Sequence, residues 1–160
     1  MGKLQFEKER ALAQGTQKVN SFSGATRSLE LSTLEQGDVF TVPEKFEVFK
    51  EKIGEGYAEF IFVENQHGDA KKLYPSMFTK SRTMVNEDST PMTKDGRVVR
   101  MSSEGTACTE YRNHATVQEA MESLINKPIE VSEVKIGRVN AFGTKNVVNT
   151  QFLVLNFVEK

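Results

Sequence analysis

The chain has 160 residues, of which 38% are hydrophobic and 27% are charged, as expected for one globular domain with its own core. No apolar run approaches the roughly 18 residues of a membrane-spanning helix, and the first residues lack the apolar core of a secretory signal. We therefore expect a cytoplasmic protein with no membrane partner.

The net charge of −1 hides an uneven distribution of charge along the chain. Residues 28–64 carry nine acidic and three basic side chains, whereas residues 65–102 carry seven basic and four acidic ones. Within the second block, residues 71–82 contain four cations and no acid. Such asymmetry can give one face a positive potential although the whole molecule is nearly neutral.

Candidate catalytic and metal-binding residues are few. Cys108 is the single cysteine, which excludes an internal disulfide and a thiolate cluster. A nucleophilic pair with His114 would need a third, orienting group, and we interpret Cys108 instead as a small residue in a polar loop. No nucleotide-binding, hydrolase or zinc-protease motif is present, so we expect no enzymatic activity, metal or cofactor. Two carboxylate pairs have spacings that are commonplace on surfaces: Glu59 with Asp69, and Glu130 with Glu133.

Residues 1–27 are predicted to form a flexible N-terminal arm. They are mostly small and polar, with too few apolar groups to offset the entropy of ordering. A short helix over residues 5–13 is the one regular element that their pattern allows. We expect residues 28–160 to form a single domain.

Alternating apolar residues and turn signals predict strands in the first half of that domain. Pro43 stops the first strand or confines it to an edge, and Tyr57–Val63 gives the strongest strand signal. The turn at Asn65–Asp69, with Gly68 at a positive φ, returns the chain through residues 70–74 as a hairpin.

Residues 81–115 form the least regular region. They are rich in polar and small residues, with a turn at Asp95-Gly96 and a short strand predicted over residues 97–101. A polar stretch of this length inside a domain is usually a functional loop or a disordered insertion, and both interpretations stay open.

The clearest helix signal lies over Thr116–Asn126. Thr116 and Glu119 have the spacing of a capping box, and Lys127-Pro128 ends the helix. An apolar stripe at helical spacing predicts packing against the core, and its members are Val117, Ala120, Met121, Leu124 and Ile125.

Two long strands are predicted at the end of the chain, over Ile129–Val139 and Val147–Val158. The second is apolar enough to be central and buried. The loop between them, Arg138–Asn146, has two cations, one aromatic residue and no acid, and could bind a polyanion.

This order of antiparallel strands, one main helix and two closing strands indicates a mainly β protein. It resembles the OB fold, a five-stranded antiparallel Greek-key barrel with its helix between strands three and four. The chain also resembles, in architecture alone, the single-stranded DNA-binding proteins of bacteria and phages that use this fold. On that template the barrel strands fall at residues 38–50, 57–64, 70–75, 129–139 and 147–158.

The resemblance implies that single-stranded DNA lies across strands two and three, flanked by the loops between strands one and two and between strands four and five. Bases would stack on aromatic rings, while Lys and Arg would contact phosphates. The matching positions are Lys71, Lys72, Tyr74, Lys80, Arg82, Arg138, Phe142 and Lys145. Each has a structural alternative: Tyr74 could close the barrel end, and the cations could be solvated surface charges.

We therefore expect a non-enzymatic module that binds single-stranded DNA, carried by a phage or mobile element. RNA as the ligand and assembly into a homo-oligomer stay open. The alternative is a structural or assembly protein, such as a virion component, that self-associates through its β domain. The long irregular segments favour this alternative.

Overall fold

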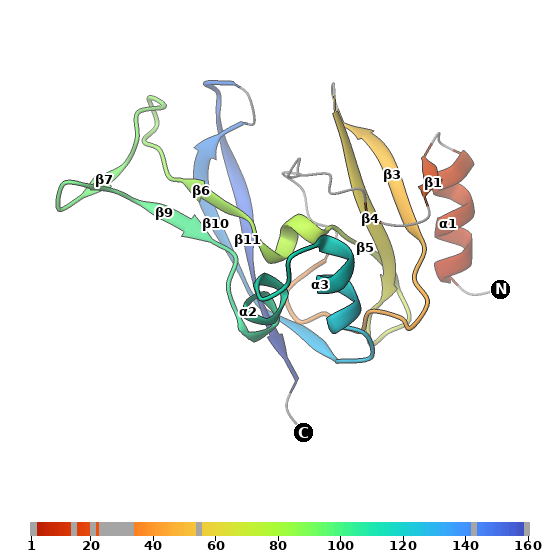
Figure 1. Cartoon of the computed structure of the whole chain (residues 1–160). Helices are drawn as coiled ribbons and strands as arrows, with labels where there is room; N and C mark the ends of the chain where they lie inside the picture. The colour runs from red at the N-terminus through yellow and green to blue at the C-terminus, as the bar shows by residue number, and fades with distance from the viewer. Residues whose placement is uncertain are drawn as a thin grey trace.

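The computed structural model describes residues 3–13, 16–19, 22, 34–53, 56–141 and 144–158 (Figure 1). Over these residues the protein is mainly β, as expected, and contains three α helices rather than one main helix. The elements follow one another in this order: α1 (Lys3–Ala13), β1 (Gln17–Val19), β2 (Val39–Phe40), β3 (Val48–Ile53), β4 (Gly56–Glu64), β5 (Ala70–Leu73), the 3₁₀ helix η1 (Pro75–Phe78), β6 (Ser81–Thr83), β7 (Thr93–Lys94), β8 (Arg97–Val98), β9 (Arg100–Ser102), α2 (Thr106–Arg112), α3 (Val117–Ser123), β10 (Ile129–Asn140) and β11 (Val147–Phe157).

The larger sheet has the strand order β1-β3-β4-β5, with antiparallel neighbours throughout. Its centre is β4, the strongest strand signal of the sequence, in which residues 58–63 are all buried. The predicted turn after β4 is confirmed, with Gly68 at a φ of +79°. The side-chain oxygen of Asn65 accepts hydrogen bonds from the amides of His67 and Asp69, both at 2.9 Å, which fixes the turn from inside.

A smaller sheet has the strand order β11-β10-β2. The first strand of the barrel template is therefore divided, because β2 pairs with β10 while β3 pairs with β4. Pro43 lies between the two pieces and has no N–H to donate to a ladder. In the described part of the chain β5 pairs only with β4, and the outer edge of β11 borders Glu104, so no barrel closes.

The segment predicted as a flexible arm contains α1 and β1. The strand β1 adds to the edge of the larger sheet by pairing with β3, and α1 lies against β4 and β5. Leu4, Val19 and Phe22 pack against the main core. This N-terminal segment therefore covers part of the larger sheet.

The irregular region contains a β arm, which we define as residues 81–102, followed by α2. The β arm projects from the body of the molecule on the left of Figure 1. The predicted turn at its tip is confirmed: Asp95 and Gly96 have φ angles of +53° and +78°, the signs of a type I′ hairpin turn. The predicted strand over residues 97–101 is split into β8 and β9 at Val99.

The capped helix is shorter than its sequence signal. Helix α3 begins after Thr116, whose hydroxyl accepts a hydrogen bond from the amide of Glu119 at 3.1 Å, as the capping-box spacing predicts. It ends at Ser123, and Asn126 adopts a φ of +61° while its amide bonds the carbonyl of Val42. The apolar stripe packs in the core as expected, with Ala120, Met121 and Leu124 buried.

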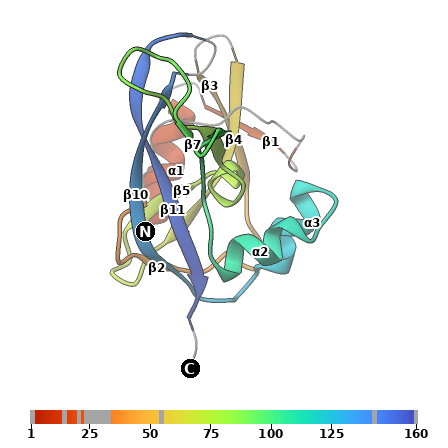
Figure 2. The same ribbon diagram turned by 90° about the vertical axis from the view of Figure 1, so that its left-hand side faces the viewer.

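The C-terminal hairpin, β10 with β11, buries opposite faces in its two halves. Near its open end Val131 and Leu155 are partners and lie in the main core. Near its loop the other face is covered, and Val139 and Phe152 form a second cluster with Met84 of the β arm. The two clusters therefore meet on one continuous pair of strands (Figures 1 and 2).

Gly105, at the start of α2, provides a stability test. Its φ is +117°, and a Cβ there would lie 2.2 Å from the carbonyl oxygen of Leu155, so Gly105→Ala must displace backbone. We expect a loss of about 3 kcal/mol in the free energy of unfolding, measured by urea titration. The matched control is Gly96→Ala, which has a positive φ but nothing within 4 Å of the added Cβ, and should cost about 1 kcal/mol. Equal losses in the two variants would contradict this account.

Candidate nucleic-acid interface

The two lysines of β5 are paired with carboxylates. Lys71 Nζ lies 3.8 Å from Asp38 Oδ2, and Lys72 Nζ lies 3.2 Å from Glu51 Oε2. Lys72 also lies over the ring of Phe60, 4.9 Å from its centroid. Both lysines therefore have a carboxylate partner within the protein, and the two ion pairs connect β5 to Asp38 and Glu51.

Tyr74 is a core residue in this structure. It is 5% exposed, its ring lies 5.4 Å from that of Phe60, and its hydroxyl donates a hydrogen bond of 2.6 Å to Glu51 Oε1. Burial, and next the hydrogen bond to Glu51, raise the pKa of Tyr74 above its usual range. A ring enclosed in this way presents no face to a base.

Lys80 and Arg82 attach the base of the β arm to the C-terminal hairpin. Lys80 is 8% exposed, and its Nζ donates a hydrogen bond of 3.4 Å to the carbonyl of Gln151. Arg82 Nη2 donates to the carbonyl of Asn140 at the end of β10. Both are cations that satisfy backbone acceptors and fix the position of the arm.

Arg138 and Lys145 lie where the hairpin loop meets the β arm. Arg138 Nη1 is 3.5 Å from Glu87 Oε1, and Glu87 is almost fully exposed, so this ion pair is weak and open to exchange. Lys145 has an exposed side chain, while its carbonyl accepts a hydrogen bond from Ser89. Phe142, the expected stacking residue of this loop, lies outside the described residues.

The predicted site residues thus fall into two groups. Lys72 and Tyr74 bond Glu51 of the larger sheet, and Lys71 pairs with Asp38 just before β2. The others with described positions surround the junction of the β arm and the C-terminal hairpin: Lys80, Arg82, Arg138 and Lys145. The structure brings together the second group and separates it from the first.

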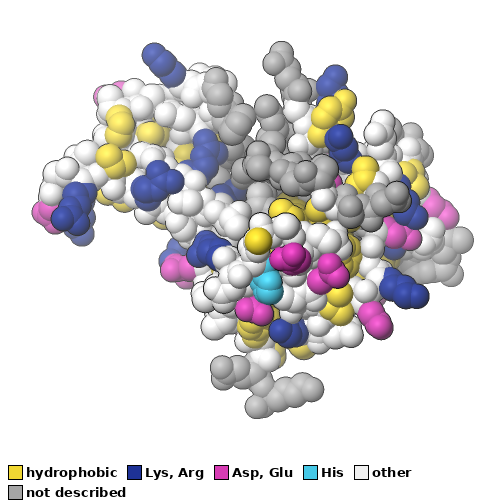
Figure 3. Space-filling model, viewed as in Figure 1, with side chains coloured by type: hydrophobic (Ala, Val, Ile, Leu, Met, Phe, Trp, Pro, Cys, Tyr) yellow, Lys and Arg dark blue, Asp and Glu magenta, His cyan; other side chains and the backbone are white. Residues whose placement is uncertain are grey.

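Three further exposed cations lie on the β arm and were not among the predicted site residues: Lys94, Arg97 and Arg100. None of them forms an ion pair with a carboxylate in the described part of the chain. Lys94 and Arg97 are register partners beside the turn, so their like charges face each other across β7 and β8. The sequence does contain a signal for Lys94 and Arg97. They flank the predicted Asp95-Gly96 turn, and a hairpin with this turn places them opposite one another. Figure 3 shows Lys and Arg prevailing over the β arm.

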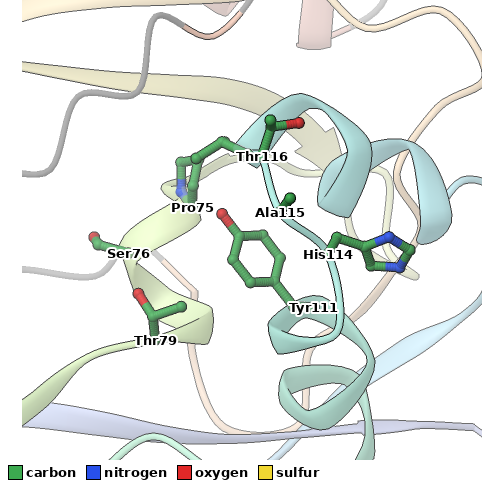
Figure 4. Close-up of a pocket in the computed structure, with 8 residues that line it drawn as sticks. Pro75, Ser76, Thr79, Tyr111, His114, Ala115 and Thr116 are labelled. Carbon is green, nitrogen blue, oxygen red and sulfur yellow. The ribbon is translucent and has the colours of Figure 1, made fainter.

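A separate hollow of about 230 Å³ lies between η1, α2 and the start of α3 (Figure 4). Tyr111 stacks on Phe78 with 4.9 Å between the ring centroids, and burial raises its pKa to about 12. Its hydroxyl points toward Pro75 in Figure 4, and the rest of the lining consists of hydroxyls, small apolar groups and the imidazole of His114. The lining carries no charged cluster suited to an anion.

The interpretation of Cys108 as a loop residue is wrong, because it is buried in α2. Burial raises the pKa of its thiol to about 11, so the nucleophilic thiolate is scarce at neutral pH. His114 Nε2 lies 3.7 Å from Glu110 Oε1 on the same side of the molecule as the hollow. Among the described residues no group of three or more His, Cys, Asp and Glu side chains could hold a metal ion.

No protein-family model, curated protein or solved structure matches this chain. No helix in the described ranges is long and apolar enough to cross a membrane. The candidate interface consists of the exposed cations of the β arm together with the adjoining loop of the C-terminal hairpin.

Replacing Tyr74 separates its structural role from a role in binding. Tyr74→Phe removes the hydroxyl that bonds Glu51 and should lower the free energy of unfolding by about 1–2 kcal/mol in urea titration. Because the ring is buried, affinity for a fluorescent dT15 oligonucleotide should stay within twofold of the parent protein. A large loss of affinity in a variant whose free energy of unfolding is unchanged would show that Tyr74 belongs to the interface.

Proposed function

We propose that the protein is a non-enzymatic, single-stranded DNA-binding protein that holds the phosphate backbone along its β arm. The observation that carries the proposal is the gathering of exposed cations on the β arm and the neighbouring loop, for which the described residues provide no carboxylate partner: Lys94, Arg97, Arg100 and Lys145. Arg138 would join them on releasing Glu87, an exchange that an exposed ion pair permits.

The electrostatics of these cations favour a polyanion. Cations facing each other across a β ladder repel, and a phosphate placed between Lys94 and Arg97 would remove that cost. Each phosphate contact also releases counterions from the nucleic acid, so binding would weaken with salt. This term does not depend on base sequence, and it requires only one face of positive potential on a nearly neutral protein.

An exposed aromatic residue favours single strands over duplex DNA. Tyr57, on β4, is 47% exposed, and Lys50 Nζ lies 4.6 Å from its ring centroid. The start of β4 and the adjoining ends of β10 and β11 lie at the same end of the molecule in Figures 1 and 2. Base stacking on an aromatic ring contributes about 1–3 kcal/mol per base, and a duplex keeps its bases out of reach.

The strand pairing supports an open, OB-like arrangement as part of this proposal. The template strands pair as β2 with β10, β3 with β4, β4 with β5, and β10 with β11. On this arrangement the loop between template strands four and five retains its binding role. The β5 surface does not, because its cations are already paired.

Anisotropy titration with dT15 at about 50 and 200 mM salt tests the proposal. We expect salt-sensitive binding, and weaker binding to a duplex of equal length. The double variant Lys94→Gln/Arg97→Gln should bind several-fold more weakly and reduce the slope of log affinity against log salt by about 1.4. The matched control is Lys45→Gln/Lys127→Gln, which removes two exposed cations outside the β arm and should leave both quantities unchanged. Absence of dT15 binding at low salt would overturn the proposal.

The second candidate function is assembly, and the shape of the β arm favours it. The arm projects from the body, Val98 near its tip is 51% exposed, and β7 and β8 pair only with each other among the described strands. Open strand edges of this kind can pair with another chain. If the arm mediates assembly, light scattering will show ordered oligomers that DNA does not change, and Val98→Lys will dissociate them. A monomer in this measurement would exclude this candidate.

A further inference from the structure

The outer face of β6 and β9 carries an ordered group of one guanidinium and three hydroxyls. In the register of this ladder Ser81 opposes Ser102 and Thr83 opposes Arg100. Alternate residues of a strand share a face, and opposed residues of an antiparallel pair lie on the same side, so these four side chains share one face. Arg82 and Met101 share the other face, which covers the C-terminal hairpin.

Hydrogen bonds to the hydroxyls hold the guanidinium in place. Arg100 Nη1 donates to Thr83 Oγ1 at 2.9 Å and Nη2 donates to Ser81 Oγ at 3.2 Å. Ser102 Oγ in turn donates to Ser81 Oγ at 3.0 Å. All of the acceptors are neutral, so the group orders the guanidinium without cancelling its charge.

This arrangement differs from that of three cations at the predicted site that form ion pairs. Lys71, Lys72 and Arg138 each lie beside a carboxylate, whereas Arg100 forms no ion pair with any residue that the structure describes. Arg100 is exposed, and its guanidinium has five N–H donors, of which the hydroxyls accept two hydrogen bonds. An oriented, uncompensated guanidinium is suited to a ligand that brings the negative charge.

We propose that this face is a seat for one phosphodiester group, bound by the guanidinium fork of Arg100 and by the hydroxyls of Ser81 and Ser102. The inference rests on the proposed function and specifies its chemistry. Guanidinium binds phosphate through two parallel N–H···O bonds, which an ammonium group cannot reproduce. Serine hydroxyls can rotate to donate to the remaining phosphate oxygens.

A seat of this kind makes binding at the arm independent of sequence. A contact with the phosphodiester group positions the strand but reads neither base nor sugar. The seat is also rigid, because the opposite face of the same ladder is fixed by Arg82 and packs on the C-terminal hairpin through Met101. A rigid, preordered contact loses less side-chain entropy on binding than a free surface lysine does.

Comparison of lysine and glutamine at two positions tests the seat. Arg97 is the matched control, since it is exposed on the same arm but makes no hydrogen bond to a hydroxyl among the described residues. Where charge alone matters, Arg97→Gln should bind dT15 about threefold more weakly than the parent, and Arg97→Lys should lose clearly less affinity than Arg97→Gln because it keeps the charge. At the seat, Arg100→Lys and Arg100→Gln should both bind about tenfold more weakly, because lysine keeps the charge and loses the fork. The double variant Ser81→Ala/Ser102→Ala should bind dT15 more weakly without changing the slope of log affinity against log salt. Urea titration of each variant checks that it is folded.

The outcomes separate the seat from the proposed function. If the parent binds dT15 and Arg100→Lys binds equally well, the seat is overturned while single-stranded DNA binding stands. If the parent does not bind dT15, titration of ¹⁵N-labelled protein with inorganic pyrophosphate tests the seat alone. A shift of the Arg100 Nε–Hε resonance that exceeds the shift of Arg97 supports the seat, and equal shifts overturn it.

Discussion

The whole arrangement depends on the C-terminal hairpin burying one face near its open end and the opposite face near its loop. The first half contributes Val131 and Leu155 to the main core, and the second half supports the β arm through Val139 and Phe152. Among the described residues Met84 is the one buried residue that the arm contributes to that second cluster, and the partly buried Met92, Val99 and Met101 pack against it, so the arm shares its core with the hairpin. Without the change of face, the cations of the arm would have no fixed position relative to the body.

Carboxylate partners decide which cations can meet a ligand. Lys71 and Lys72 belong to the acid-free stretch, residues 71–82, that looks most basic in the sequence. In the folded protein, however, Asp38 and Glu51 come from other parts of the chain and form ion pairs with them. The β arm also has four cations, but they are spread over 22 residues that include three acids, and several of them have no carboxylate partner among the described residues. Local charge density is therefore a poor guide to a binding surface, because compensation is a property of tertiary structure.

The features predicted correctly from sequence are those with local causes. The turn after β4 follows from Asn65 and Gly68, the cap of α3 from Thr116, and the tip of the arm from Asp95-Gly96. What could not be predicted depends on register and on distant partners. The burial of Tyr74 requires β3 and β5 to flank β4 so that Glu51 meets its hydroxyl, and no spacing in the sequence encodes that meeting. The helix α2 was missed because its seven residues give no strong periodic signal, and Lys94 and Arg97 were missed although the predicted Asp95-Gly96 turn places them opposite each other.

The pairing of β2 with β10 has a consequence for synthesis of the chain. The strands β3 to β5 are made before the C-terminal hairpin, and they carry the aromatic cluster of Phe49, Phe60 and Phe62. Ile129, which pairs with Phe40 and lies in the same core, follows Phe62 by more than 60 residues. Until the hairpin has been made, the aromatic cluster lacks part of its cover, so completion of this core waits for a contact between distant parts of the chain.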